Sequence, residues 1–265
     1  MPAVNPTQLR FQLDALLGIF SDPAGFHHEL SDLFSKYANL ALRFGKEVPP
    51  KPLINMYHLP FPVIRQLRLD LTKSVIKDPQ SAKALVAELW SDPYLEVKET
   101  AIFIFGQIPF SDPKPIIEQI KVWLDSDIEK VLKEEILSMG THTLKKCFQT
   151  DWEGLLKTLL SKKSEKMIYL GLYGLSEGLK SPEFYNFPIA FRLISDIISE
   201  PKVVYRSALV NLIEVLANRS PVETAYFLRQ TLSLSQSSEL PRLIKQCLGF
   251  FPGDIQENLK SSLNR

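Results

Sequence analysis

Four histidines are the side chains of this chain best suited to bind a metal ion or to transfer a proton. His27 and His28 are adjacent, so on a helix their rings point about 100° apart and make a poor pair of metal ligands. His58 lies in a proline-rich connector, and His142 lies between two threonines. We therefore expect each histidine to be solvated or hydrogen-bonded, and we predict no metal site.

Carboxylates are concentrated at Glu129, Glu134 and Glu135, with Lys130 among them. Two carboxylates close together can act as a general acid and a general base. The same residues at helical spacing also form an ordinary solvated face stabilised by i,i+4 ion pairs. We favour the solvated face, and we assign no catalytic residue here.

Glycines recur every three or four residues at Gly171, Gly174 and Gly178, next to Tyr169 and Tyr173. Glycine destabilises a helix interior unless another group must approach the backbone closely. The pattern predicts a close helix–helix contact rather than an opening for a ligand.

The chain contains no Walker phosphate loop, no GxGxxG and no HExxH, so none of these enzyme signatures is present. We expect no cofactor. The two cysteines, Cys147 and Cys247, are far apart and have no metal-ligand spacing, so we predict two buried free thiols in a reducing compartment.

Charge is distributed unevenly, although the formal net charge is only +1. Residues 81–140 carry 6 basic and 11 acidic side chains, a balance of −5, whereas residues 141–180 carry 7 and 4, a balance of +3. A concentrated basic stretch can contact phosphates in a salt-sensitive way, or it can be plain solvated surface. The basic stretch comprises Lys145, Lys146, Lys157, Lys162, Lys163 and Lys166.

Helical periodicity runs through most of the chain, and the 45% apolar and 23% charged composition is ordinary for a globular protein. Residues 7–20 predict an opening amphipathic helix, and Asp22-Pro23 predicts the start of a second helix that runs toward Gly45. Residues 46–62 hold five prolines and should be largely extended. A third helix is expected from Pro62 to Asp78.

From Ser81 onward the pattern becomes regular. In residues 81–109 one apolar run ends at Trp90, the turn Ser91-Asp92-Pro93 follows, and a second run begins. Asp92 should cap that second helix, and Trp90 should pack between successive hairpins. The first helices of later hairpins should end near Leu124, Leu160, Ile198 and Leu232, in steps of 34, 36, 38 and 34 residues.

A repeat of this length indicates an α-solenoid, and no strand is predicted. Val203, Arg206 and Ala208, like Val97 and Ala101, stand near positions typical of HEAT repeats, an armadillo-type fold. We expect an all-α, single domain over residues 1–265. It comprises irregular helices over 1–80, about five HEAT-like hairpins over 81–252, and a terminal cap over 253–265.

Residues 55–109 resemble bacterial AlkD-type DNA alkylation-repair proteins. The resemblance rests on the connector and proline-started helix from His58 to Leu67, on the sequence Glu88-Leu89-Trp90, and on Glu96 followed by Ala101. It implies a HEAT-like solenoid whose concave face embraces duplex DNA and removes alkylated purines.

The resemblance does not extend to the residues that carry activity in the family. Active members place tryptophans and an aspartate on the helix that corresponds to residues 127–140, where this chain has no tryptophan and has glutamates instead. They also place an arginine on the helix that corresponds to residues 165–175, where this chain has none. Trp123 and Trp152 lie on first helices of hairpins, which usually face the convex side.

Two functions follow as hypotheses. The first is duplex DNA binding with doubtful base excision, through Arg65, Arg68, Lys145, Lys146, Lys162, Lys163 and Lys166. The second is a non-catalytic HEAT-repeat scaffold that binds a protein on its concave face. The N-terminus has no basic segment followed by an apolar run, and no apolar stretch is long enough to span a membrane. We therefore expect a cytoplasmic monomer without a membrane partner.

Overall fold

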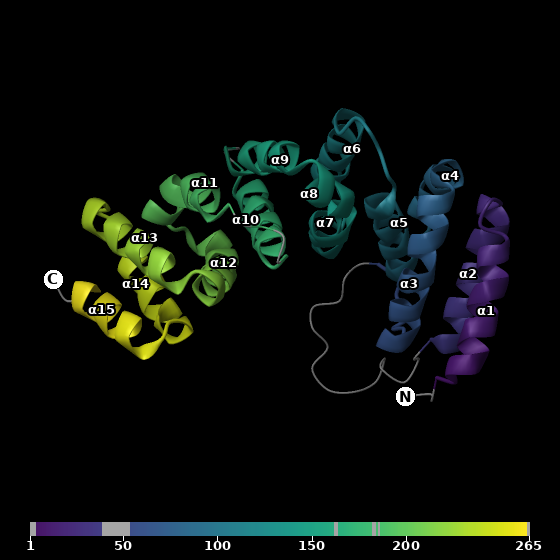
Figure 1. Cartoon of the computed structure of the whole chain (residues 1–265), viewed down its shortest axis with the longest axis horizontal. Helices are drawn as coiled ribbons and strands as arrows, with labels where there is room; N and C mark the ends of the chain where they lie inside the picture. Colours follow the sequence, from purple (N-terminus) through teal and green to yellow (C-terminus); the bar gives the residue numbers. More distant parts are fainter. Residues whose placement is uncertain (1–3, 39–53, 162–163, 182–183, 185, 264–265) are drawn as a thin grey trace. The chain divides into compact units, whose positions relative to one another are not determined.

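The structure is a computed structural model that describes residues 4–38, 54–161, 164–181, 184 and 186–263 (Figure 1). Over these residues the chain is helical and contains no strand; an isolated bridge pairs Asn55 with Tyr94. The all-α prediction is confirmed. Within the same residues, no helix combines the length and the apolar character needed to cross a membrane.

Two compact units make up the chain, Met1–Phe148 and Gln149–Arg265. Each unit is described here by itself. A single continuous domain over all 265 residues therefore stays a prediction.

In the first unit, helices adjacent in sequence pair as hairpins and alternate helices pack in rows. One row contains α1, α3, α5 and then α7 with the π-turn that follows it, and α2 packs on α4. The three helices within residues 1–80 belong to these rows. The elements are α1 (Pro6–Gly18), α2 (Pro23–Tyr37), α3 (Phe61–Lys77), α4 (Pro79–Trp90), α5 (Leu95–Gln107), α6 (Lys114–Asp125), α7 (Lys130–Glu135), the π-turn η2 (Ile136–Gly140) and α8 (His142–Cys147).

Asp22-Pro23 begins a helix as the sequence predicts, and Asp78-Pro79, which was predicted only to end the third helix, begins α4 in the same way, because the carboxylate accepts a free backbone N–H and proline fits the first turn. Asp22 accepts from the backbone N–H of Gly25 at 3.2 Å, and Asp78 accepts from that of Ser81 at 3.1 Å. Asp92 is the exception. It accepts from the backbone N–H of Tyr94 at 2.7 Å, and α5 begins only at Leu95, so the prediction that Asp92 caps this helix is wrong.

Helix α5 is the centre of the first unit, with most of its residues buried. A Cβ added at Gly106 would lie 2.0 Å from the carbonyl oxygen of Met139, so only glycine allows the π-turn to pack this closely. Thr143 donates a 2.7 Å hydrogen bond to the Gly106 carbonyl across the same crossing. Residues 127–140, which the periodicity predicts as one helix, thus divide into α7 and this π-turn.

The second unit repeats the two-row arrangement. Helices α10, α12 and α14 pack in one row, and α9, α11, α13 and α15 pack in the other. First helices end within two residues of the predicted positions. The elements are α9 (Gln149–Ser161), α10 (Glu165–Leu179), α11 (Phe187–Ser199), η3 (Val203–Tyr205), α12 (Arg206–Arg219), α13 (Pro221–Leu234), α14 (Glu239–Cys247), η4 (Leu248–Phe250) and α15 (Gly253–Leu263).

The glycines of α10 lie where the sequence analysis expected a close helix contact. A Cβ on Gly171 would meet Leu160 of α9 at 2.8 Å, and one on Gly178 would meet the Trp152 ring at 2.2 Å. Trp152 is itself 1% exposed, so the indole fills the space that Gly178 leaves. The predicted close contact is confirmed at Gly171 and Gly178.

The two cysteines differ in their surroundings. Cys247 is buried, and burial raises the pKa of its thiol to about 12. Cys147 is exposed at the end of α8, so the prediction of two buried thiols is wrong for this residue. The helix ends at Cys147 and turns its last residue toward solvent, which apolar periodicity alone did not reveal.

Candidate functional site

Three helices of one row, α3, α5 and α7, bring charged side chains together in the first unit. Arg68 of α3 donates to Glu135 of α7 with a 2.8 Å separation between its Nη2 and Oε1. The guanidinium also lies over the Phe103 ring of α5, 5.5 Å from its centroid. Arg68 is thus held from two sides by residues far away in sequence.

Glu99 of α5 is the third charged member of this cluster. Burial raises the pKa of its carboxyl group to about 7, and the negative charge of Glu135 acts in the same direction, while Arg68 opposes it. A carboxylic acid with such a pKa can hold or release a proton near neutral pH. We name Arg68, Glu99 and Glu135 the inner-row cluster.

The carboxylates that are concentrated at Glu129, Glu134 and Glu135 do not all have the same role in the structure. Glu134 lies 3.5 Å from Lys130, the i,i+4 pair expected of a solvated helix face. Glu135 instead reaches across to α3, and Glu99 was not among the candidates. No local signal could have indicated Glu99, since its proton affinity depends on burial between helices that are distant in sequence.

The predicted DNA-contacting residues lie in different surroundings. Arg65 is exposed on α3, whereas Arg68 is paired with Glu135. Lys145 donates to the carbonyl oxygen of Ser138 at 2.6 Å and is half-buried, and Lys146 beside it is exposed. Lys145 therefore supports the π-turn and is not simply a surface charge.

The remaining predicted residues belong to the other part of the chain. Lys166 is exposed on α10 in the second unit, while Lys162 and Lys163 lie outside the described residues. A common surface for the basic stretch and the α3 arginines stays a prediction.

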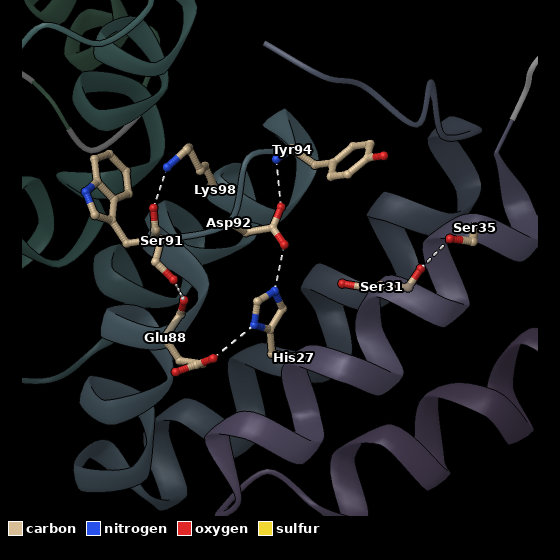
Figure 2. Close-up of polar contacts among 9 residues, drawn as sticks. His27, Ser31, Ser35, Glu88, Ser91, Asp92, Tyr94 and Lys98 are labelled. Carbon is tan, nitrogen blue, oxygen red and sulfur yellow. Dashed lines mark hydrogen bonds and ion pairs between the residues drawn. The ribbon is translucent and has the colours of Figure 1, made fainter.

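His27 has the most specific environment among the histidines (Figure 2). Its Nδ1 lies 3.1 Å from Glu88 Oε1 on α4, and its Nε2 lies 2.7 Å from Asp92 Oδ2 in the following turn. We call these three residues the His27 clamp. Burial works to lower the imidazole pKa, but the hydrogen bonds and charges of Asp92 and Glu88 outweigh it, so the pKa is raised. A hydrogen-bonded role for this histidine is confirmed.

The connector before α3 is fastened to α5 by a buried carboxylate. Glu96 accepts hydrogen bonds from the backbone N–H groups of Tyr57 at 3.0 Å and His58 at 2.7 Å. Leu95 donates to the carbonyl of Asn55 at 2.8 Å, and Tyr57 stacks on Tyr94 with ring centroids 4.2 Å apart. His58 thus contributes its backbone here, in the left-handed conformation with φ 55°.

Trp123 and Trp152 do not offer an open aromatic surface. Trp123 is 6% exposed and stacks on Trp90 with centroids 4.3 Å apart, and Trp152 is 1% exposed. Neither can stack on a base without unpacking its helix.

A groove of 350 Å³ lies between α11 and α13 in the second unit, lined in part by Asp196, Phe227 and Leu234. Its hydroxyl groups donate to backbone carbonyls, as Ser235 does to Ser199 at 2.6 Å. The hydroxyl groups of the groove are therefore already engaged by the backbone of α11 and α13. Across the described residues, no three His, Cys, Asp or Glu side chains gather in a way that could hold a metal ion.

Comparison of the sequence with models of known protein families and with curated proteins found no match.

Proposed function

We propose that this protein is a HEAT-like α-solenoid, related to the AlkD-type family, that binds duplex DNA and does not excise alkylated bases. The row packing of alternate helices within each unit supports a stack of helical hairpins. The relationship to the family is supported by the packing of residues within 55–109, the stretch in which the sequence resembles that family.

The observation that carries this proposal is the way residues 55–109 interlock. Glu96 is 5% exposed and holds the connector backbone, and Ala101, five residues later, is fully buried. Trp90 ends α4 and stacks on α6 through Trp123. Glu96, Ala101 and Trp90, which belong to the resemblance, therefore each have a packing role, as a shared scaffold would require.

Exposed basic side chains supply the phosphate contacts in this proposal. Arg65, Lys146 and Lys166 are exposed on α3, α8 and α10, and each neutralised phosphate releases condensed counterions. Excision is not proposed, because helices α7 and α8 contain no tryptophan and Glu135 is already paired with Arg68.

A shift assay with a short duplex tests the proposal. The double variant Lys146→Ala/Lys166→Ala should weaken binding uniformly across sequences and lower the salt slope by about 2. The matched control is Lys83→Ala/Lys114→Ala, which removes two exposed lysines from α4 and α6. The absence of a complex at low salt would contradict duplex binding, and equal loss in both variants would contradict the assignment of the contacts to Lys146 and Lys166. Release of alkylated purine from a treated duplex would contradict the absence of excision.

A second function, a protein-binding scaffold, is favoured by the inner-row cluster. Arg68 is neutralised by Glu135, and Glu99 adds a further carboxyl group beside it. A polyanion gains little from such a surface, whereas a protein can match both charges. Duplex binding would fail and a specific protein complex would persist if this second function is the correct one.

A further inference from the structure

Helix α3 presents an apolar stripe to solvent. Phe61, Leu69 and Ile76 are 72%, 54% and 59% exposed, although α3 buries Val63, Leu67, Leu71 and Val75 on its opposite side. Isolated exposed apolar residues are ordinary, but a line of large ones on one helix indicates an interaction site. The stripe extends for about 22 Å at 1.5 Å per residue.

Basic side chains accompany the stripe. Arg65 and Lys73 are exposed and, with the three apolar residues, fall within about 120° of the helix circumference. We call these five residues the α3 face. Asp70, the only acidic residue of α3, is half-buried and accepts from Gln66 at 2.9 Å. The charge of the α3 face is therefore purely positive.

The spacing of the apolar residues matches a helical partner. Leu69 and Ile76 are seven residues apart, the interval at which side chains stay in line between two packed helices. On duplex DNA the apolar side chains would lie against phosphates. Burying them there would not stabilise the complex. A helix with its own apolar seam and acidic flanks would bury the stripe and pair with both bases.

We propose that the α3 face is the docking site for an acidic amphipathic helix of a partner protein. This inference rests on the scaffold function rather than on duplex binding. Arg65 belongs to both proposals, but Lys146 and Lys166, which test duplex binding, lie outside the α3 face, so the two proposals can fail separately.

The probe is a fluorescein-labelled helical peptide of three heptads with leucine at positions a and d and glutamate at e and g. Its binding to the full chain is followed by fluorescence anisotropy. We expect saturable binding, and at least about tenfold weaker binding of the same peptide with lysine in place of glutamate. Equal affinity for the two peptides would overturn the proposal.

Variants connect the binding to the α3 face. Leu69→Asp/Ile76→Asp should weaken the glutamate peptide at least about tenfold, and Arg65→Glu/Lys73→Glu should abolish its preference over the lysine peptide. The matched control Val222→Asp/Leu234→Asp changes two exposed apolar residues of α13, 64% and 77% exposed, and should bind normally. Circular dichroism verifies that each variant is folded.

Other occupants give different results. Phosphatidylserine vesicles that sediment the wild type but not Leu69→Asp/Ile76→Asp, without peptide binding, would overturn the proposal in favour of a lipid surface. Loss of duplex affinity in that variant, again without peptide binding, would overturn it in favour of DNA. Peptide binding unchanged by Leu69→Asp/Ile76→Asp would place the site elsewhere and also overturn it.

Discussion

His27 of α2 and Asp92 of the α4–α5 turn are joined by a 2.7 Å contact between Nε2 and Oδ2, 65 residues apart in the chain. The second ring nitrogen faces Glu88 on α4. With a carboxylate at each nitrogen, the imidazolium form can donate both hydrogen bonds. The contact fixes the first helical hairpin against the next one through charge as well as apolar packing.

The His27 clamp should make folding stability depend on pH. Because its folded pKa is raised above the ordinary 6.5, its contribution is complete below that pH and is lost as pH rises through the folded pKa. His27→Gln should remove about 2 kcal/mol at pH 5.5 and much less at pH 8.5. Urea unfolding at both values measures this. The neighbouring His28→Gln, on an exposed side chain, is the control, and an equal loss at both pH values would refute the charge-based clamp.

Glu99 should weaken the fold as its proton is lost. Its folded pKa of about 7 exceeds the ordinary 4.5, so the folded state binds more protons and stability falls between these values as pH rises. Glu99→Gln should therefore raise the unfolding free energy at pH 8 by up to about 3 kcal/mol, with little gain at pH 4.5. Denaturant titrations of the wild type and Glu99→Gln at these two pH values measure the gain. A gain that is independent of pH would indicate a packing effect instead.

Glu96 should be essential for the connector. Glu96→Ala removes the acceptor of two backbone N–H groups and should destabilise the protein by about 3 kcal/mol. Hydrogen exchange at the Tyr57 and His58 amides should rise in the same variant. As a control, Glu118→Ala removes an exposed glutamate of α6 and should change neither measurement.

The left-handed backbone at His58 makes a separate prediction. With φ at 55°, a β-branched side chain is strained, so His58→Val should destabilise the protein by about 1–2 kcal/mol. His58→Gly should be tolerated better than His58→Val. Thermal unfolding of the two variants compares them directly, and the reverse order would contradict a conformational origin.

Trp90 should contribute less stability than a fully buried tryptophan. It is only half-buried, although it stacks on Trp123 and lies under the Lys98 ammonium at 5.1 Å. We expect Trp90→Ala to cost about 2–3 kcal/mol, at the lower end for a large core residue. Trp123→Ala, at a 6% exposed site, should cost more, and chemical denaturation of both variants tests this order.

Local signals predicted most helices but neither the π-turn η2 nor the charged cluster of Arg68, Glu99 and Glu135. Periodicity and aspartate–proline pairs predicted the hairpins and the ends of first helices, because capping and amphipathicity act within a few residues. Asp92 precedes a proline as Asp78 does, but only Asp78 caps its helix, since Asp92 accepts from Tyr94 within the turn and α5 begins only at Leu95. The other carboxylate oxygen of Asp92 contacts His27, 65 residues away, which no local signal indicates.

The sequence by itself determined the helical character of the residues that the structure describes and the close contacts of Gly171 and Gly178 in α10. Only the tertiary structure decided which charges are already paired. Arg68 looked like a free cation in the sequence, yet it faces Glu135, and Glu99 became a titratable group near neutral pH through burial. The physical reason is that helix formation depends on neighbours in the chain, whereas charge pairing and desolvation depend on neighbours in space.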